Sequence, residues 1–312
     1  MKAKKLISIV TPCFNEEANV EILHTQIVEV MSEMPEYDFE HIYIDNASTD
    51  QTLPILRKLA ADDKRVKVIV NSRNFGHIRS PFYGLLQARG DAVIGMASDL
   101  QDPPSMIKDF IGKWEEGFKV VMGVKTRSEE PKILYKLRTL FYKTLAKLSD
   151  VQLVENFTGF GCYDQQVIEI LRQMNDPYPY FRGLIADIGF PTAKIEFTQS
   201  KRKRGITKNN FYTLYDMAML GFTNNTKVPL RLATMLGFLS ALVSFLIGIF
   251  YLIYKLVNWQ NFQLGSAPIV IGLFFFGAIQ LLFLGIVGEY IGAIYTQVLH
   301  RPLVIEKERI NF

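Results

Sequence analysis

Residues 97–104 read Ala-Ser-Asp-Leu-Gln-Asp-Pro-Pro, and the interpretation of the whole chain starts from this stretch. The apolar run 92–96 before it predicts a buried strand, and residues 105–114 after it have a helical pattern. Asp99 and Gln101 therefore lie in a loop at the carboxyl end of a strand, where open α/β sheets bind ligands. In an extended segment their oxygens point the same way and suit Mg²⁺ or Mn²⁺. The alternative is that Asp99 caps the next helix and the rest of the loop is only a turn.

Length and composition limit the possible classes. The chain has 312 residues and a net charge of +4, which gives no indication of nucleic-acid binding. Cys13 and Cys162 are far apart and fit a reducing compartment without a disulfide framework. The first apolar run, residues 6–10, is interrupted soon afterwards by polar residues, so we interpret it as a strand and not as a targeting segment.

Strands and helices alternate over the first two hundred residues. Apolar runs predict strands at residues 6–10, 39–44, 66–70, 92–96, 118–124 and 192–198. This alternation predicts an α/β fold with a mostly parallel, doubly wound sheet. Polar residues follow successive strands and are expected at one edge of that sheet, as in a nucleotide site: Asn15, Glu16, Asp45, Asn46, Asn74, Asp99 and Gln101. The chain lacks G-x-G-x-x-G after the first strand and has no P-loop motif.

Four segments in this order carry a resemblance. They are residues 10–17 (Val-Thr-Pro-Cys-Phe-Asn-Glu-Glu), 44–50 (Ile-Asp-Asn-Ala-Ser-Thr-Asp), 72–77 (Ser-Arg-Asn-Phe-Gly-His) and 99–104. The chain resembles the family 2 glycosyltransferases, and among them the polyisoprenyl-phosphate glycosyltransferases, the group of dolichol-phosphate mannose synthase and bactoprenol glucosyltransferase. The resemblance spans nearly the whole chain and implies a GT-A-like (Rossmann-like) catalytic domain.

The resemblance also implies roles for matching residues. It assigns nucleotide-sugar binding to Pro12, Asn15, Glu16, Asp45, Asn74 and Asp99. It assigns the catalytic, metal-binding role in the D-x-D-x-Q loop to Asp99 and Gln101, with Mg²⁺ or Mn²⁺ as the cofactor. Two positions depart from the family pattern, because Ala97 replaces the first acid of that loop and Asn46 replaces the second acid of an Asp-Asp pair.

A third departure concerns the acceptor side of the site. Where the family often has a G-D-F-R-type segment, gapless alignment places Gly159 and Gly161, so a conventional catalytic base is absent from this segment. The expected acceptor is a phosphate monoester with a second pKa near 6, which is mostly ionised at neutral pH and needs little activation. Asp164 is close in sequence, but we predict that it caps the following helix.

Two basic segments follow the sheet pattern. Residues 132–149 predict an amphipathic helix with an all-basic polar face, which favours an anionic membrane surface over an ordinary solvated helix. Residues 200–208 hold five basic residues within eight positions and fit either a solvated loop or a phosphate clamp. We favour the clamp, since Arg202, Thr207 and Lys208 match the family's R-x-x-G-x-[ST]-K segment and would bind diphosphate and lipid phosphate.

The last third of the chain predicts a membrane anchor. Residues 232–254 and 267–288 carry no charge, and each run is long enough to cross a bilayer, whereas two buried core helices are the alternative. Basic residues flank the outer ends of this pair, which places the catalytic domain and both termini in the cytoplasm. The predicted organisation is a catalytic domain (1–208), an interfacial helix (209–228), two transmembrane helices within 229–295 (about 230–254 and 267–292) and a cytoplasmic tail (296–312).

The combined prediction is an enzyme that transfers a sugar, with inversion, from a nucleotide sugar (a UDP-sugar) to a polyprenyl phosphate such as undecaprenyl or dolichyl phosphate. The reaction would serve the synthesis or modification of cell-surface glycans. Ala97, Asn46 and Gly159 motivate an alternative, a non-catalytic membrane protein that binds the nucleotide sugar or the lipid phosphate. Gly288 and Gly292 are four residues apart and allow close helix contact within or between subunits, so a homo-oligomer stays open.

Overall fold

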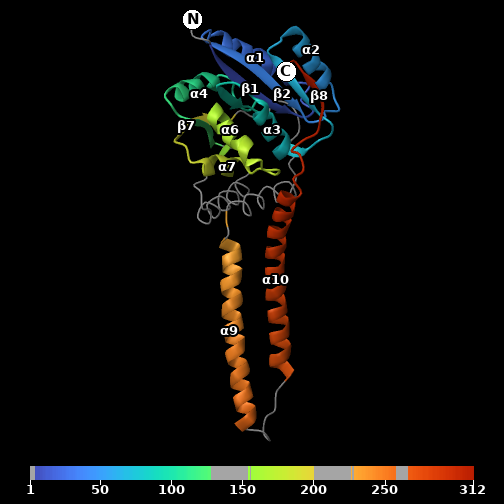
Figure 1. Cartoon of the computed structure of the whole chain (residues 1–312), viewed down its shortest axis with the longest axis vertical. Coiled ribbons are helices and arrows are strands. Elements are labelled where there is room, and N and C mark those ends of the chain that lie inside the picture. Colours follow the sequence, from blue (N-terminus) through green and yellow to red (C-terminus); the bar gives the residue numbers. More distant parts are fainter. Residues whose placement is uncertain (1–3, 128–153, 155, 200–225, 227, 258–265) are drawn as a thin grey trace.

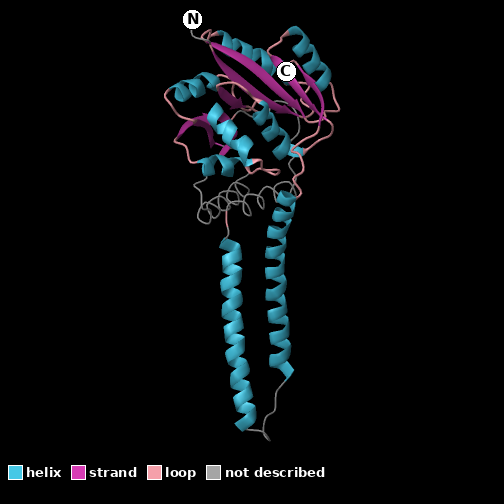
Figure 2. Ribbon diagram, in the orientation of Figure 1, coloured by secondary structure: helices cyan, strands magenta, loops and turns pink. Residues whose placement is uncertain are grey.

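The computed structural model describes residues 4–127, 154, 156–199, 226, 228–257 and 266–312, which form an α/β domain and two long helices (Figures 1 and 2). The strands are β1 (Lys5–Cys13), β2 (Tyr37–Asp45), β3 (Val66–Asn71), β4 (Ala92–Gly95), β5 (Val120–Arg127), β6 (Phe157–Asp164), β7 (Thr192–Thr198) and β8 (Glu306–Ile310). The helices are α1 (Val20–Ser32), α2 (Thr52–Asp62), α3 (Gly76–Gln87), α4 (Met106–Glu115), α6 (Gln165–Met174), α7 (Phe181–Ile188), α9 (Val228–Val257) and α10 (Ser266–Val298).

Among the described residues the sheet has eight strands in the order β7-β5-β6-β4-β1-β2-β3-β8. Strand β1 pairs in parallel with β2 and β4, β2 with β3, and β5 with β7, whereas β6 and β8 run antiparallel to their neighbours. Strands of a parallel sheet are covered on both faces and are therefore apolar throughout. Ile7, Ile9 and Val10 of β1 accordingly have almost no exposed surface. The predicted α/β class with a mostly parallel sheet is confirmed.

Helices cover both faces of this sheet (Figure 2). On one face, Leu23 of α1 and Phe110 of α4 belong to one buried cluster with Ile9 of β1. On the other face, Phe82 of α3 belongs to a second buried cluster that includes Val10 of β1. Because neighbouring residues of β1 serve opposite faces, the strand itself separates the two layers. The carboxyl ends of β1, β2 and β4 then lie at one edge of the sheet, where the loops can form a site.

The sequence pattern does not predict β6, because glycines interrupt its apolar run. This strand lies between β4 and β5, and Gly161 is paired with Gly95 on one side and Met122 on the other. A Cβ atom at Gly161 would lie 2.4 Å from the carbonyl oxygen of Val121, so the backbones approach too closely for any side chain there. Gly159 has a φ of +100°, which L side chains rarely adopt.

The predicted cap of α6 is confirmed. Asp164 ends β6, and its Oδ1 atom accepts a hydrogen bond from the backbone N–H of Gln166 at 3.0 Å. Its Oδ2 atom accepts hydrogen bonds from the indole N–H of Trp114 at 2.8 Å and from Nζ of Lys119 at 3.0 Å. Asp164 therefore joins α4, β6 and α6 and serves the fold.

The C-terminal segment differs from the prediction. Residues 296–312 are predicted to be a tail outside the catalytic domain, but β8 within this segment pairs antiparallel with β3. Tyr83 of α3 donates a hydrogen bond to Glu306 at 2.7 Å, and the Asn311 amide donates to the Ala60 carbonyl oxygen at 2.6 Å. The strand is short and four of its five residues are charged, so its apolar pattern is too weak to predict an edge strand.

Helices α9 and α10 contain the stretches Val228–Phe250 and Phe275–Val298, each long and apolar enough to cross a membrane. These stretches are not buried inside the structure, and large side chains such as Phe238 and Leu281 are 73% and 72% exposed. Buried core helices would not expose such side chains, which disfavours that alternative. The two helices form the apolar hairpin that the sequence predicts. Three predicted features lie outside the described residues except at Thr226 and Val228: the basic helix 132–149, the basic segment 200–208 and the interfacial helix 209–228.

Candidate active site

The loop after β4 turns at Leu100, which has a φ of 59°. The Asp99 carboxylate accepts a hydrogen bond from the backbone N–H of Gln101 at 3.1 Å, so the two residues flank a turn and not the extended segment that the sequence analysis assumes. Helix α4 begins after Ser105, and no side chain caps its N-terminus. The alternative that Asp99 is only a helix cap is therefore wrong.

Asp102 is a second carboxylate of this loop, and the sequence assigns it no role in the site. The residue is 5% exposed, and its Oδ2 atom accepts a hydrogen bond from the backbone N–H of Ala97 at 3.2 Å. Burial raises the pKa of Asp102 to about 6, although this hydrogen bond and the charge of Lys125 oppose the shift. Ala97, which replaces the first acid of the family's loop, is thus in direct contact with the carboxylate of Asp102.

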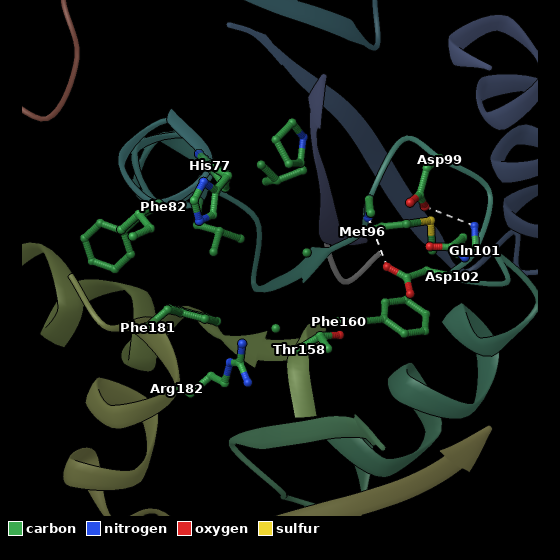
Figure 3. Close-up of a pocket in the computed structure, with 18 of the residues that line it drawn as sticks. His77, Phe82, Met96, Asp99, Gln101, Asp102, Thr158, Phe160, Phe181 and Arg182 are labelled. Carbon is green, nitrogen blue, oxygen red and sulfur yellow. Dashed lines mark hydrogen bonds between the residues drawn. The ribbon is translucent and has the colours of Figure 1, made fainter. Parts of the chain in front are cut away.

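A cavity of about 340 Å³ lies beside this loop (Figure 3). Its walls come from β1, β4, β5, β6, α3 and α7. Three of the predicted site residues line it, namely Pro12, Asp99 and Gln101. Polar and charged lining residues that the sequence analysis missed include His77, Asp102, Lys125, Thr158, Arg182 and Gln199. Of these, His77 and Asp102 stand inside segments that carry the family resemblance, 72–77 and 99–104.

The two ends of the cavity differ in chemistry. Figure 3 shows the acidic loop 99–102 at one end, with Phe82, Phe181 and Arg182 at the other. The Phe82 and Phe181 rings pack edge to face with their centroids 6.1 Å apart, which makes a firm apolar wall. Arg182 belongs to the first turn of α7, a helix at the end of the domain that faces α9 and α10 (Figure 1). The acidic end thus lies deeper in the domain than the aromatic and cationic end.

Four predicted site residues do not line this cavity: Asn15, Glu16, Asp45 and Asn74. The first three connect the loops after β1 and β2. The backbone N–H of Asn15 donates to Oγ of Ser48 at 2.9 Å, and the backbone N–H of Ser48 donates to Asp45 at 3.2 Å. Asp45 is fully buried, and burial raises its pKa. A role of these residues in nucleotide binding stays a prediction.

Asn46 joins the loops after β2 and β3. Its carbonyl oxygen accepts hydrogen bonds from the Asn71 amide at 3.1 Å and from the backbone N–H of Phe75 at 2.9 Å. Its NH₂ group donates to Oδ1 of Asn74 at 2.9 Å and to the carbonyl oxygen of Gly76 at 3.2 Å. An ionised aspartate has no donor for these two acceptors. The amide that departs from the family pattern is therefore the group that this network requires.

The donor set of the acidic loop is compatible with a hard divalent cation. Asp99 offers a carboxylate and Gln101 an amide oxygen, and Asp102 adds a buried carboxylate behind them. Among the described residues there is no cluster of three or more His, Cys, Asp and Glu side chains that would form a complete protein cage. Mg²⁺ and Mn²⁺ do not need such a cage, because Mg²⁺ usually binds one or two carboxylates together with water and substrate phosphates. The residues present fit that mode of binding.

The last described residue before the predicted phosphate clamp lines the cavity. Gln199 is a lining residue and directly follows β7, whereas Arg202, Thr207 and Lys208 lie outside the described residues. Their role in binding phosphate stays a prediction.

Comparison with known proteins assigns the chain to a family. Residues 8–171 match Glycosyl transferase family 2, and residues 228–294 match the GtrB C-terminal hairpin. The chain belongs to the family 2 glycosyltransferases, as its motifs predict, and combines the family's catalytic domain with a membrane hairpin.

Relatives that match nearly the whole chain show which members of the family it is similar to. The chain is 35% identical over 300 residues to the uncharacterized glycosyltransferase YkcC of Bacillus subtilis (strain 168), covering 96% of this chain and 92% of that protein. It is 34% identical over 302 residues to the bactoprenol glucosyl transferase of Shigella phage SfV, covering 96% and 98%. Among solved structures, Mycobacterium tuberculosis glucosyl-3-phosphoglycerate synthase is similar over 71% of this chain and 80% of its own, with a TM-score of 0.47 and 20% identity.

Proposed function

We propose that this glycosyltransferase moves a sugar from a UDP-sugar to a polyprenyl phosphate at the cytoplasmic face of the membrane, with inversion at the anomeric carbon. The observation that carries the proposal is the composition of the cavity. One end holds the acidic loop 99–102, and the end nearer the membrane hairpin holds Arg182 with aromatic walls. The relatives named bactoprenol glucosyl transferase support the choice of a polyprenyl acceptor.

The reaction requires one bond to form as another breaks. An oxygen of the lipid phosphate attacks the anomeric carbon, and the bond from that carbon to the diphosphate oxygen breaks, so the UDP leaves with the bonding electrons. A phosphate monoester has a second pKa near 6 and is mostly a dianion at neutral pH. It therefore needs no general base. This is consistent with glycines at positions 159 and 161, where the family often has an acid and an arginine.

Charge neutralisation is the main task of the protein, since diphosphate and lipid phosphate are both anions. Asp99 and Gln101 would hold a divalent cation, which when bound stabilises the charge that develops on the departing diphosphate. Arg182 binds a phosphate group through its planar guanidinium, and Lys125 adds a second positive charge in the cavity. Phe82 and Phe181 exclude water beside Arg182 and offer an apolar surface to the first isoprene units.

The position of β8 supports the proposed topology. The domain precedes α9, and β8 follows α10, yet both belong to one sheet. The two hairpin ends that connect to the domain must then lie on the same side of the membrane. Arg231 in the first turns of α9 and Arg301 after α10 favour the cytoplasm for that side.

A donor panel tests the proposal. Purified full-length protein would be incubated with Mn²⁺, a polyprenyl phosphate and a series of labelled nucleotide sugars, and lipid-linked products would be separated by chromatography. We expect a product with one UDP-sugar, and a reduction of about 10²-fold or more in Asp99→Asn and Arg182→Gln, because each removes charge from the site. Asp109→Asn, an exposed acid on α4, is the matched control and should keep full activity.

Two outcomes separate the parts of this proposal. If no donor yields a lipid-linked product, the proposed reaction is wrong. If the product forms equally well in Asp99→Asn and in the presence of a chelator, the metal assignment is wrong while the reaction class stands.

A further inference from the structure

Three arginines gather where the α/β domain meets the end of α10. The guanidinium carbons of Arg73 and Arg79 lie 4.0 and 5.4 Å from the centre of the Phe75 ring, so one aromatic side chain carries two cations. Arg79 also donates a hydrogen bond to the carbonyl oxygen of Pro302, the residue after Arg301. Arg73, Arg79 and Arg301 are together called the arginine cluster.

The positive charge of the arginine cluster is not balanced by acids. In the part of the chain that the structure describes, none of the three arginines forms an ion pair with a carboxylate, and Arg73 and Arg79 donate hydrogen bonds to carbonyl oxygens. Burial, together with the neighbouring charges of Arg73 and Arg301, lowers the pKa of Arg79 and outweighs the opposing effect of Tyr178, as expected for cations held close together.

Arg79 has an unused donor in addition to its unbalanced charge. Its Nε atom is buried and has no hydrogen-bond partner among the described residues. Buried polar groups in native proteins almost always have a partner, and each exception calls for a specific explanation. A bound anion would satisfy this donor and relieve the repulsion between the three guanidinium groups.

Among the described residues, no carboxylate pairs with the cluster to supply that anion. Asp176 contacts the end of α10, but its Oδ1 atom accepts hydrogen bonds from the Gln297 amide and from the backbone N–H of Tyr178, both at 2.9 Å. None of the three arginines lines the cavity of the active site. The cluster is therefore separate from the groups that would bind the donor and acceptor.

The location of the cluster indicates the source of the anion. Helix α10 ends at Val298 with the end of its apolar stretch, and Arg301 follows three residues later, within roughly 10 Å even if the chain is fully extended. Figure 1 shows the chain leaving α10 and passing α3 on its way to β8. Charged groups this close to the end of a membrane helix lie at the level of the lipid headgroups.

We propose that the arginine cluster binds the phosphate of an anionic phospholipid headgroup, such as that of phosphatidylglycerol. Arg73 and Arg301 are exposed and reach the headgroup from two segments far apart in the sequence, and the half-buried Arg79 lies between them. The bound lipid ties α3 of the catalytic domain to the membrane surface. This contact is independent of the proposed sugar transfer.

The test measures lipid binding to the full-length protein in a non-ionic detergent. Soluble dihexanoyl phosphatidylglycerol would be titrated by microscale thermophoresis, with dihexanoyl phosphatidylcholine and inorganic phosphate as parallel ligands. We expect Arg73→Gln and Arg301→Gln to weaken phosphatidylglycerol binding about fivefold each, since one basic residue near an anionic surface contributes that much. Both positions are exposed, so these variants should keep the wild-type melting temperature.

Two further variants sharpen the result. Lys58→Gln removes an exposed cation from α2 and should bind like wild type. Arg79→Lys keeps the charge but loses the planar donor set, so it should weaken binding without removing it. The proposal fails if the Arg73→Gln/Arg301→Gln double variant binds phosphatidylglycerol as tightly as Lys58→Gln. It also fails if phosphatidylcholine or inorganic phosphate binds the wild type as tightly as phosphatidylglycerol.

Discussion

Replacing Gly161 with alanine tests the close approach of β5 and β6. The new Cβ would lie 2.4 Å from the Val121 carbonyl oxygen and 3.4 Å from Cα of Met122, and neither backbone atom can rotate away. The strands must separate by roughly half an ångström, and overpacking of this kind destabilises a core by about 1–3 kcal/mol. Weakening one ladder hydrogen bond adds about 1 kcal/mol. We expect a total of about 2–4 kcal/mol, or a fall of about 5–15 °C in melting temperature for a domain of this size.

The assay is thermal unfolding of the full-length protein in detergent, followed by the fluorescence of Trp114. This tryptophan is 8% exposed and bonds to Asp164 of β6, so it reports on the affected layer. A Trp259→Phe background leaves Trp114 as the only tryptophan. The control is Gly112→Ala, because a Cβ there meets nothing within 4 Å and helix α4 should gain about 0.5–1 kcal/mol.

Equal melting temperatures for Gly161→Ala and the wild type would refute the reasoning. A fall in both alanine variants would instead indicate general sensitivity of the domain. If Gly161→Ala alone is destabilised, then restoring the family's arginine at this position cannot be expected to give a folded protein. The positive charge that this arginine provides in the family must then come from another side chain, and Arg182 lines the cavity.

Three further predictions concern histidines, the loop network and the C-terminal strand. Burial lowers the pKa of His24 and His41, whose Nδ1 atoms are 3.2 Å apart, so both bind protons more weakly in the folded than in the unfolded protein. The unfolded pKa is about 6.5, so this stability should be complete above that pH and fall below it by at most about 1.4 kcal/mol per pH unit for each histidine. A His41→Gln variant whose melting temperature falls as steeply as that of the wild type between pH 7.5 and 5.5 would contradict this. Asn46→Asp should lower the free energy of unfolding by about 1–3 kcal/mol at pH 7.5, because a carboxylate would face the Oδ1 atom of Asn74. The loss should be smaller at pH 4.5, where protonation of the new acid restores a donor. A larger loss at pH 4.5 than at pH 7.5 would exclude that cause. Deleting residues 304–312 should expose the edge of β3 and cause aggregation, seen as concentration-dependent light scattering. The control variant Lys307→Gln keeps the strand and should not aggregate. A truncated protein that stays monodisperse would count against β8 as a cover for that edge.

The sequence predicts the parallel part of the sheet well, because its strands are short segments rich in apolar residues, as a sheet covered on both faces requires. Strand β6 is not predicted, since Gly159 and Gly161 remove the side chains on which pattern analysis depends. Strand β8 is not predicted either, because an edge strand buries little and Glu306–Ile310 has too few apolar residues. Both strands are defined by their neighbours, which lie far away in the chain.

The candidate site is likewise only partly predictable from the sequence. The position of Asp99 and Gln101 at a strand end follows from local sequence, and the structure places both on the cavity wall. The contact between Asp102 and Ala97 depends on the left-handed turn at Leu100, which residue types alone do not reveal. Arg182 reaches the cavity only because α7 packs against β6, a contact between segments with no signature in the sequence.

The pairing of β8 with β3 also determines the order in which the protein can be assembled. Residues 306–310 follow both membrane helices in the chain, so β8 can pair with β3 only after the whole hairpin has been synthesised. Until then the β3 edge is open, and unpaired edges attract other strands. The hairpin returns the chain to this edge, because β8 follows α10 and pairs with β3. A fusion partner attached after Phe312 would begin beside the sheet and not at the end of a free tail.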